Sequence, residues 1–197
     1  MNEKDLIFKV ATSKSDIEKA QHLAWRIYGQ ELKYFDPKKN VPKLHTDEYD
    51  PHSLHVIAEH HGEIVGSLRL ILDSEIGFYI EKDFQLKEKL EDRKHTGEIS
   101  RLIVLPEHRG GARLISMGLL KKTLEVSKNN AVSIWLAVMN EGLKTSFEKS
   151  AKGIVIKPLA FLSAHGPQAE KIRSRMPGYY KSVDPRPYII DIAHISL

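Results

Sequence analysis

Residues 96–124, TGEISRLIVLPEHRGGARLISMGLLKKTL, predict a strand, a tight basic turn and a helix in direct succession. The apolar, β-compatible run over Glu98–Leu105 is typical of a strand, and Pro106 ends it because proline cannot donate to a sheet ladder. Gly110 and Gly111 are free to adopt positive φ, which favours a turn. The helix that follows has apolar residues at spacings of three and four, namely Leu114, Met117, Leu120 and Leu124.

Two charged side chains interrupt this apolar strand, Glu98 and Arg101. Buried charges are costly unless they are paired or used, so the two residues are either a structural pair at a strand end or part of a site. In a regular strand they would point to opposite faces, because side chains alternate with a period of two. A shared site therefore predicts a β-bulge near Ser100 that turns one of them toward the other.

Composition bounds the class of protein. The chain has 197 residues, of which 41% are hydrophobic and 28% charged, so we expect one globular domain spanning residues 1–197. It has no cysteine, which excludes thiolate chemistry and disulfides. The net charge of +4 does not call for nucleic acid. No apolar run reaches the ~18 residues of a membrane span and the first residues do not read as a signal peptide, so we expect a cytoplasmic protein without an integral membrane segment.

The order of elements predicts an α+β fold in which helices cover both faces of a mixed sheet. A first strand and a helix are followed by an irregular stretch, a β-hairpin, the strand–turn–helix above, a buried strand, a short helix closed by Gly153, and final strands. The predicted ranges are 5–11 and 15–32, then 33–53, then 54–59 with 63–72, and then 132–138, 139–153 and 188–195. Residues 76–93 predict a short extended piece and a charged helix, residues 154–162 are extended, and residues 163–178 are polar with only a weak period.

Polar residues outside the central stretch are also candidates for a functional site. Arg69 lies in the apolar run IVGSLRLIL, where a buried guanidinium must find a carboxylate. The irregular stretch ends in Asp47-Glu48-Tyr49-Asp50, which is either part of a binding loop or a solvated acidic loop. Histidines 55, 60 and 61 predict no metal site, because two of them lie in a turn and no acidic or histidine partner has ligand spacing.

These features together resemble a known superfamily. The order of elements and the segment VLPEHRGGARLISMGLLKKTLE are similar to the acyl-CoA-binding region of the GNAT N-acyltransferases, an α/β/α-type sandwich with a mixed, mostly antiparallel sheet. Within it, the chain resembles the autoinducer (acyl-homoserine-lactone) synthases, the N-acyl amino acid synthases and the exosortase-associated acyltransferases. The shared features are an arginine in the first helix, a D-x-x-D segment, a central-strand arginine and an E-x-x-R strand, here Arg26, Asp47 with Asp50, Arg69, and Glu98 with Arg101.

The resemblance implies transfer of a fatty acyl group from acyl carrier protein or acyl-CoA to the amine of an amino acid or similar acceptor. Glu98 would be the base and would act with Ser100 and Arg101; Asp47 and Asp50 would hold the acceptor's ammonium. Arg69 and Arg101 would hold its carboxylate or lock the acids in place, and Arg26 would also lie at the acceptor site. The phosphopantetheine arm and the oxyanion would lie along Ile103, Val104, Leu105, Arg109, Gly110, Gly111, Ala112 and Arg113. The acyl chain would lie against Trp135, Leu136, Met139 and Phe147, which are equally plausible as ordinary core.

Departures from the family patterns bear on the substrates. Ala112 and Leu114 replace small residues of the usual pyrophosphate turn, and Phe147 stands where many acetyltransferases have a tyrosine acid. Both departures favour acyl carrier protein over acetyl-CoA. Trp25 precedes Arg26, whereas the autoinducer synthases have a tryptophan after that arginine, which favours a plain amino acid over S-adenosylmethionine.

The alternatives are an S-adenosylmethionine-dependent autoinducer synthase, an acetyl-CoA-dependent acetyltransferase, and a non-catalytic module that binds an acyl carrier or a lipid. We expect no bound cofactor and no metal; acyl carrier protein or acyl-CoA would be a co-substrate. A basic helix face of Arg109, Arg113, Lys121, Lys122 and Lys128 would dock the acidic carrier protein, or would simply be solvated.

Overall fold

A computed structural model describes residues 5–39, 42–150, 154–163 and 165–195. Its centre is a seven-stranded sheet in the order β1-β2-β3-β5-β6-β9-β7, in which only the β5–β6 pair is parallel. The strands are β1 (Leu6–Val10), β2 (Ser53–His60), β3 (Glu63–Leu72), β5 (Thr96–Val104), β6 (Ile134–Met139), β7 (Val155–Pro158) and β9 (Arg186–Asp191). A separate two-stranded sheet joins β4 (Gln85–Leu86) to β8 (Phe161–Ser163).

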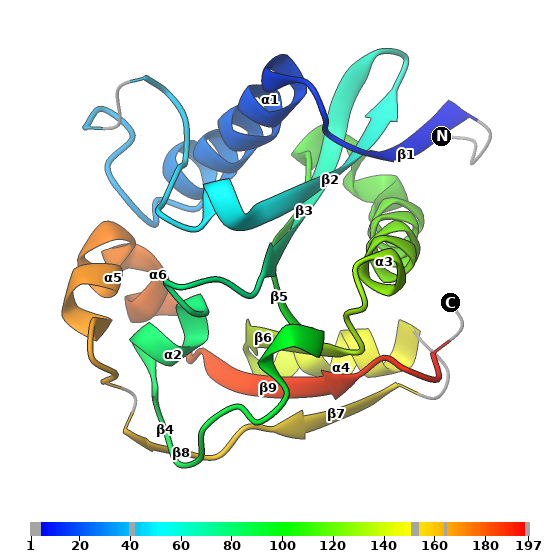
Figure 1. Ribbon diagram of the computed structural model, residues 1–197. Coiled ribbons are helices and arrows are strands. Elements are labelled where there is room, and N and C mark those ends of the chain that lie inside the picture. Colours follow the sequence, from blue (N-terminus) through cyan, green and yellow to red (C-terminus); the bar gives the residue numbers. More distant parts are fainter. Residues whose placement is uncertain (1–4, 40–41, 151–153, 164, 196–197) are drawn as a thin grey trace.

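Helices lie on both faces of the sheet (Figure 1). They are α1 (Lys14–Trp25), continued by a π-helix η2 (Arg26–Glu31), then α2 (Tyr79–Asp83), α3 (Ala112–Asn129), α4 (Glu141–Ser150), α5 (Ala169–Arg175) and α6 (Pro177–Ser182). Short 3₁₀ helices are η3 (Asp50–His52), η4 (Arg93–His95) and η5 (Pro106–Gly111). The expected mixed sheet between helical layers is therefore confirmed.

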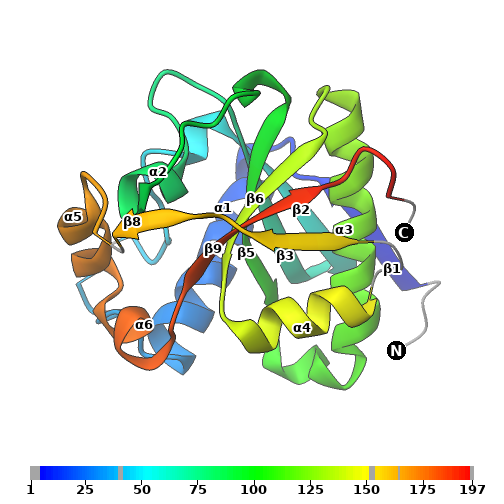
Figure 2. The same ribbon diagram turned by 90° about the horizontal axis from the view of Figure 1, so that it is seen from below.

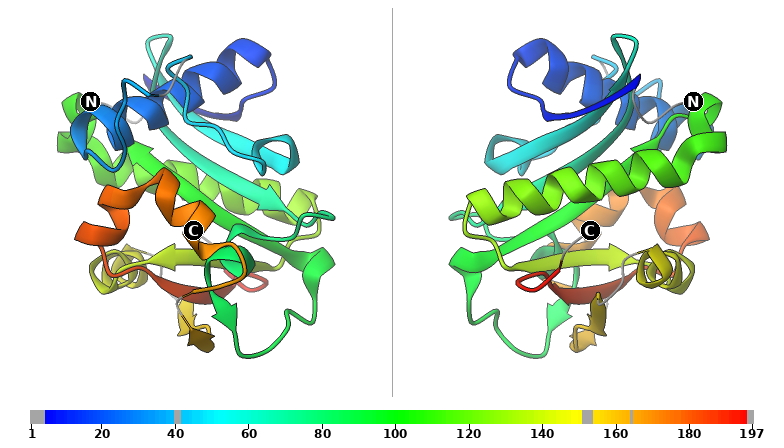
Figure 3. Two further views of the ribbon diagram at one scale, coloured as in Figure 1. Left: turned by 90° about the vertical axis from the view of Figure 1, so that its left-hand side faces the viewer. Right: turned by 90° about the vertical axis from the view of Figure 1, so that its right-hand side faces the viewer.

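Strand alternation assigns the helices to the two faces. Ile57 of β2 packs in a cluster with Ala20 of α1, so α1 lies on one face. A Cβ on Gly66 of β3 would meet Ile115 and Leu119 of α3, so α3 lies on the other, as Figure 3 shows. Trp135 of β6 is fully buried on the α3 side and donates to the Ser127 hydroxyl at 2.8 Å. Figure 2 shows β7 and β9 side by side at the end of the sheet near α4.

The β-bulge expected near Ser100 is present in β5. Ser100 pairs with Arg69 and Ile103 pairs with Ser67, so Arg101 and Leu102 together oppose the single residue Leu68. Arg101 has a φ of 53°, a left-handed conformation that costs a non-glycine residue about 1–2 kcal/mol. The bulge turns the Arg101 side chain to the face that already carries Glu98.

Strands β5 and β6 diverge after a short paired segment. Their parallel pairing covers only Thr96–Ile99 of β5 against Ile134–Ala137 of β6. Beyond Ile99 the edge of β5 that faces β6 has no strand partner within the described residues. The sheet is thereby split at the bulge, and unpaired backbone groups of β5 face the gap.

Several expected boundaries differ in the structure. The expected turn at 108–111 is part of the 3₁₀ helix η5, which runs directly into α3 without a reversal. Gly110 and Gly111 therefore do not adopt positive φ, and among the described glycines only Gly62 and Gly77 do. The first helix is α only to Trp25 and is capped by Ser13. The pairing of β4 with β8 and the helices α5 and α6 were not predicted, and Gly153 lies outside the described residues.

Candidate active site

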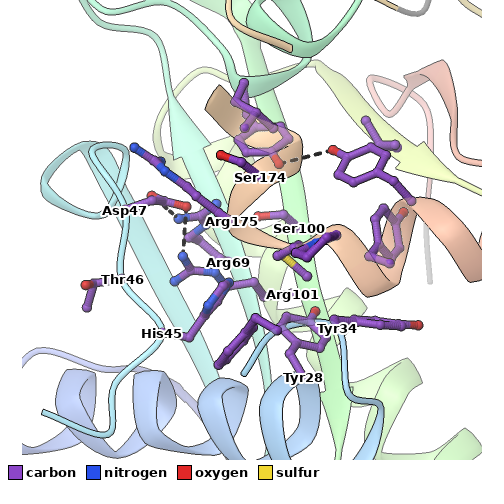
Figure 4. Close-up of a pocket in the computed structure, with 18 of the residues that line it drawn as sticks. Tyr28, Tyr34, His45, Thr46, Asp47, Arg69, Ser100, Arg101, Ser174 and Arg175 are labelled. Carbon is purple, nitrogen blue, oxygen red and sulfur yellow. Dashed lines mark hydrogen bonds and ion pairs between the residues drawn. The ribbon is translucent and has the colours of Figure 1, made fainter. Parts of the chain in front are cut away.

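A cavity of about 690 Å³ opens on the α1 face of the sheet, where β5 and β6 diverge. Its floor is formed by Glu98–Arg101 of β5 with Val138 of β6. One wall comes from η2 and the irregular stretch 34–48, and the other from residues 172–180 of α5 and α6. Figure 4 shows Asp47, Arg69 and Arg101 close together, with Tyr28 and Tyr34 below them in this view.

Two acids and two arginines form a compact buried network at the cavity wall. Arg69 donates from Nη1 to Asp47 Oδ1 at 2.7 Å and to Asp50 Oδ1 at 3.3 Å. Arg101 donates to Asp50 Oδ1 and to Asp47 Oδ2, both at 2.8 Å. The Nε of Arg69 donates to the Ser100 hydroxyl at 2.9 Å. The sequence motifs predicted these residues as one site, and the structure does bring them together.

The carboxylates of this network have few free acceptor positions. Asp47 Oδ1 also accepts from the Tyr49 amide, and Asp50 Oδ2 accepts from the Asp47 amide. Burial alone would raise the pKa of Asp47, but the charges of Arg69 and Arg101 outweigh it and hold the pKa below its usual value. Asp50 is also buried, but the His55 imidazole, whose Nε2 lies 3.3 Å from Asp50 Oδ1, and the same two guanidinium groups lower its pKa. The geometry thus matches the interpretation in which the arginines lock the acids in place.

Glu98 lies at the cavity floor with 2% of its surface exposed. Burial raises the pKa of its carboxyl to about 8, although the amide of Ile80 and the charge of Arg69 act in the opposite direction. The Ile80 amide, at the start of α2, donates to Glu98 Oε2 at 3.1 Å. A carboxyl that titrates near neutral pH and faces a cavity is suited to accept a proton from a bound amine.

Aromatic rings form much of the remaining wall, and the sequence reasoning did not predict most of them. His45 stacks on Phe35 at a centroid distance of 5.3 Å and meets the Tyr28 ring edge-on at 5.4 Å. Burial and the charge of Arg101 lower the pKa of His45 to about 3, so its imidazole is neutral. Tyr79 and Tyr179 also face the cavity.

Helices α5 and α6 are held over the cavity by long-range contacts. Asp83 is fully buried and accepts from Arg173 Nε at 2.9 Å and from the Tyr180 hydroxyl at 2.8 Å. Glu48, next to the acidic pair, accepts from Arg175 and Lys171 of α5. The stretch 163–178, which seemed weakly patterned in the sequence, therefore builds one wall of the site.

The donor side of the site follows from the sheet register. The Leu105 amide donates to Val65 O at 2.9 Å, so it is not free for an oxyanion. Alternation in an antiparallel ladder then turns the Ile103 amide toward β3 and the Val104 amide away from it, toward the gap beside β6. Of the amides expected along residues 103–105, Val104 is the one whose direction suits an oxyanion.

The basic residues expected at the donor turn are partly engaged within the protein. Arg109 donates to both carboxylate oxygens of Glu31, at 2.6 and 2.9 Å. Arg113 is exposed and makes no hydrogen bond or ion pair with the described residues. A Cβ on Gly110 would meet nothing within 4 Å, so this turn is open to solvent. Gly111 and Ala112 complete the passage into α3.

Arg26 and the residues predicted to contact the acyl chain do not line the cavity. Arg26 pairs with Glu107 on η5 and lines a separate hollow beside α1. Trp135, Met139 and Phe147 are buried in the main hydrophobic core, where apolar burial accounts for them. Leu136 is likewise buried, in a second cluster. The interpretation of these side chains as ordinary core is the one that matches the structure.

Comparison with known proteins supports the assignment of the fold. The chain has the GNAT fold, and residues 23–118 match the family described as "Acetyltransferase (GNAT) domain". A search of curated sequences gave no match. Within the described residues, no helix is long and apolar enough to cross a membrane.

Solved structures of several proteins have the same fold. TofI, in a complex with an inhibitor and MTA, is 15% identical with a TM-score of 0.69 and covers 95% of this chain and 91% of its own. The CoA-dependent acyl-homoserine lactone synthase BjaI, with SAM and isopentyl-CoA, is 19% identical with a TM-score of 0.67 and covers 92% and 78%. A GNAT-family acetyltransferase from Staphylococcus aureus Mu50 is 14% identical with a TM-score of 0.54 and covers 95% and 99%. The resemblance to the GNAT proteins and autoinducer synthases is therefore confirmed at the level of fold.

Proposed function

We propose that the protein is an N-acyltransferase that moves an acyl group from a phosphopantetheine thioester to the amine of a small, carboxylate-bearing acceptor. The observation that carries the proposal is Glu98, a buried carboxyl with a pKa near 8, facing a cavity where β5 and β6 separate. At that position the Glu98 carboxylate, acting as a base, lies next to the gap between β5 and β6. An extended thioester arm can lie in this gap against the unpaired backbone of β5. The GNAT match over residues 23–118 supports the same class of reaction.

In the proposed reaction the amine nitrogen attacks the thioester carbonyl, the C–N bond forms, and the C–S bond breaks. Glu98 takes the amine proton, directly or through a water molecule, and returns it to the departing thiolate. The Val104 amide, directed at the gap, stabilises the oxyanion of the tetrahedral intermediate. Phe147 is buried in the core and supplies no acid, which a thiolate leaving group does not require.

The acceptor's carboxylate is assigned to the arginine pair. Arg69 donates through Nε and Nη1, and Arg101 through its two terminal nitrogens. Each guanidinium has five N–H donors, so both retain donors beyond those contacts. The oxygens of Asp47 and Asp50 already accept hydrogen bonds, whereas the two arginines retain free donors. The network can therefore bind an anion more readily than an ammonium, which suits the carboxylate of an amino acid.

For the acyl donor we propose acyl carrier protein, with acyl-CoA as the other source of the same arm. Arg113 and Lys121 are exposed on α3 and make no hydrogen bonds or ion pairs with the described residues, so both are available to an acidic partner. Lys122 pairs with Glu125, and Lys128 donates to the Ile195 carbonyl. The docking face is therefore smaller than the five residues expected from the sequence.

A second candidate is an autoinducer synthase that uses S-adenosylmethionine. Two features of the cavity favour it: its volume exceeds what a single amino acid fills, and aromatic rings line it. The rings of Tyr28, Tyr34 and Phe35 lie where they can stack on an adenine. Release of methylthioadenosine and a lactone would identify this reaction.

The test is mass spectrometry of lipid extracts from a bacterial host that expresses the wild type, Glu98→Gln or the exposed control Glu88→Gln. We expect a new N-acylated amino acid with the wild type and the control, and a yield reduced about 10²–10⁴-fold with Glu98→Gln. The mass of the product names both the acyl group and the acceptor.

A purified assay removes the dependence on the host. Thiol release is followed with a panel of acyl carrier proteins and acyl-CoAs, and a bacterial small-molecule extract serves as the source of acceptors. Absence of thiol release above background with every donor, or equal release by the wild type and Glu98→Gln, would contradict the proposal.

A further inference from the structure

A second cluster of chemically active side chains lies at the turn of the β2–β3 hairpin, apart from the cavity. The turn residues His61 and Gly62 both have positive φ, 50° and 84°. Two such residues in a hairpin match a type I′ turn, whose usual sequences are Asn-Gly and Asp-Gly. Here a histidine takes the first place, and the rings of His60 and His61 lie 4.2 Å apart.

The pairing of β1 with β2 brings an acid to these histidines. Leu6 of β1 pairs with His60 of β2, so Asp5 emerges beside the turn. One ligand atom from each of Asp5, His60 and His61 lies within 4.8 Å of the others. The sequence reasoning predicted no metal because no acid had ligand spacing to the histidines. Strand pairing supplies that acid from a distant part of the chain.

A third imidazole lies close by on another element. The ring of His108, in η5, is 5.5 Å from that of His60 and nearly perpendicular to it. Asp5 directly precedes the first strand, His61 lies in the hairpin turn, and His108 lies in η5 before α3. All four are at least partly open to solvent, so an ion can reach them without rearrangement of the core.

We propose that Asp5, His60 and His61, with His108 as a fourth ligand, bind a divalent first-row transition metal of the Zn²⁺ type. Imidazole nitrogens with one carboxylate are a ligand set that Zn²⁺, Ni²⁺ and Cu²⁺ prefer, whereas Mg²⁺ and Ca²⁺ prefer oxygen ligands. Zinc bonds of about 2.0–2.2 Å require these groups to close in by small side-chain rotations. The ion ties the first strand to the hairpin and to η5, and takes no part in the proposed acyl transfer.

The experiment uses the full chain without an affinity tag, stripped with a chelator and titrated with Zn²⁺ against a chromophoric competitor. We expect one equivalent of Zn²⁺ to bind, and Tm to rise by roughly 5–10 °C at a hundredfold excess over Kd. His61→Gln and Asp5→Asn should each weaken binding roughly 100-fold or more. His108→Gln should weaken it roughly tenfold.

The matched control is His95→Gln, because His95 Nδ1 lies 2.8 Å from Asp92 in a half-exposed histidine–acid pair that has no third ligand among the described residues. This variant should bind Zn²⁺ as the wild type does. Wild-type affinity in both His61→Gln and Asp5→Asn, or an equal loss in His95→Gln, would overturn the site. Asp5→Asn guards against misfolding of the hairpin, since Asp5 is exposed and precedes the first strand.

Discussion

At the scale of single residues, Glu98 ties the stability of the fold to pH. Burial raises its pKa from 4.5 to about 8, so between these values the folded protein binds a proton that the unfolded chain releases. The free energy of unfolding therefore falls as pH rises through this window, by at most about 1.4 kcal/mol per pH unit. The contribution is fully present below pH 4.5 and is lost above pH 8.

Glu98→Gln removes this dependence, because an amide does not ionise. We expect the Tm of the variant, relative to the wild type, to increase steadily from pH 5 to pH 8.5. Thermal unfolding in a pH series measures it, and Glu88→Gln should show no such trend. Parallel curves for Glu98→Gln and the wild type would mean that Glu98 is not a buried, proton-binding carboxyl.

At the scale of elements, the bulge in β5 shapes the site on one face of the sheet, and the packing of α3 supports the opposite face. The bulge turns Arg101 toward the face of Glu98, and α3 holds the opposite face of β5 in place. Gly118 of α3 is where β1 approaches the helix: a Cβ there would overlap the ring of Phe8. The absence of a side chain at Gly118 therefore sets how closely the first strand packs.

Gly118→Ala should lower the free energy of unfolding by about 1–3 kcal/mol, since overpacking forces the ring or the strand to move. In a Phe8→Ala background the same substitution should stabilise by about 0.5–1 kcal/mol, because alanine is the better helix former. Urea unfolding of the four proteins gives both values. The same destabilisation in both backgrounds would contradict the contact.

At the scale of the whole molecule, the buried network joins segments that are distant in the chain. Arg69 in the middle of the sheet contacts Asp47 and Asp50 before β2 and Ser100 in β5. Glu48 and Asp83 extend the connection to α5 and α6. The cavity wall and the core of the sheet are therefore expected to unfold together.

Arg69→Met should lower the free energy of unfolding by about 3–5 kcal/mol, because it leaves two buried acids with one guanidinium. The matched control is Arg93→Met, which removes an arginine that also pairs with two acids, Asp73 and Glu81, but is one-third exposed; its effect should stay under about 1 kcal/mol. Urea unfolding compares the two, and similar losses would show that burial of the network does not matter.

The sequence by itself determined the strand–turn–helix at residues 96–124, the order of elements and the resemblance to GNAT proteins. These depend on local periodicity and on short motifs, which are visible within one segment. It also predicted the bulge near Ser100, because Glu98 and Arg101 have the wrong spacing for one face of a regular strand. The grouping of Asp47, Asp50, Arg69 and Arg101 followed from the resemblance to the acyltransferase families, while the cost of burying charge predicted only that Arg69 needs a carboxylate partner.

Only the tertiary structure decided which residues line the cavity and which residues lie near the histidines of the β2–β3 turn. Asp83 meets Arg173, Glu48 meets Arg175, and Asp5 meets His61 across long stretches of chain, and no local pattern records such contacts. The same holds for Trp135 and Phe147, whose apolar character fits a tunnel as well as a core. Which of the two they form depends on where β6 and α4 pack, and that is fixed by the sheet as a whole.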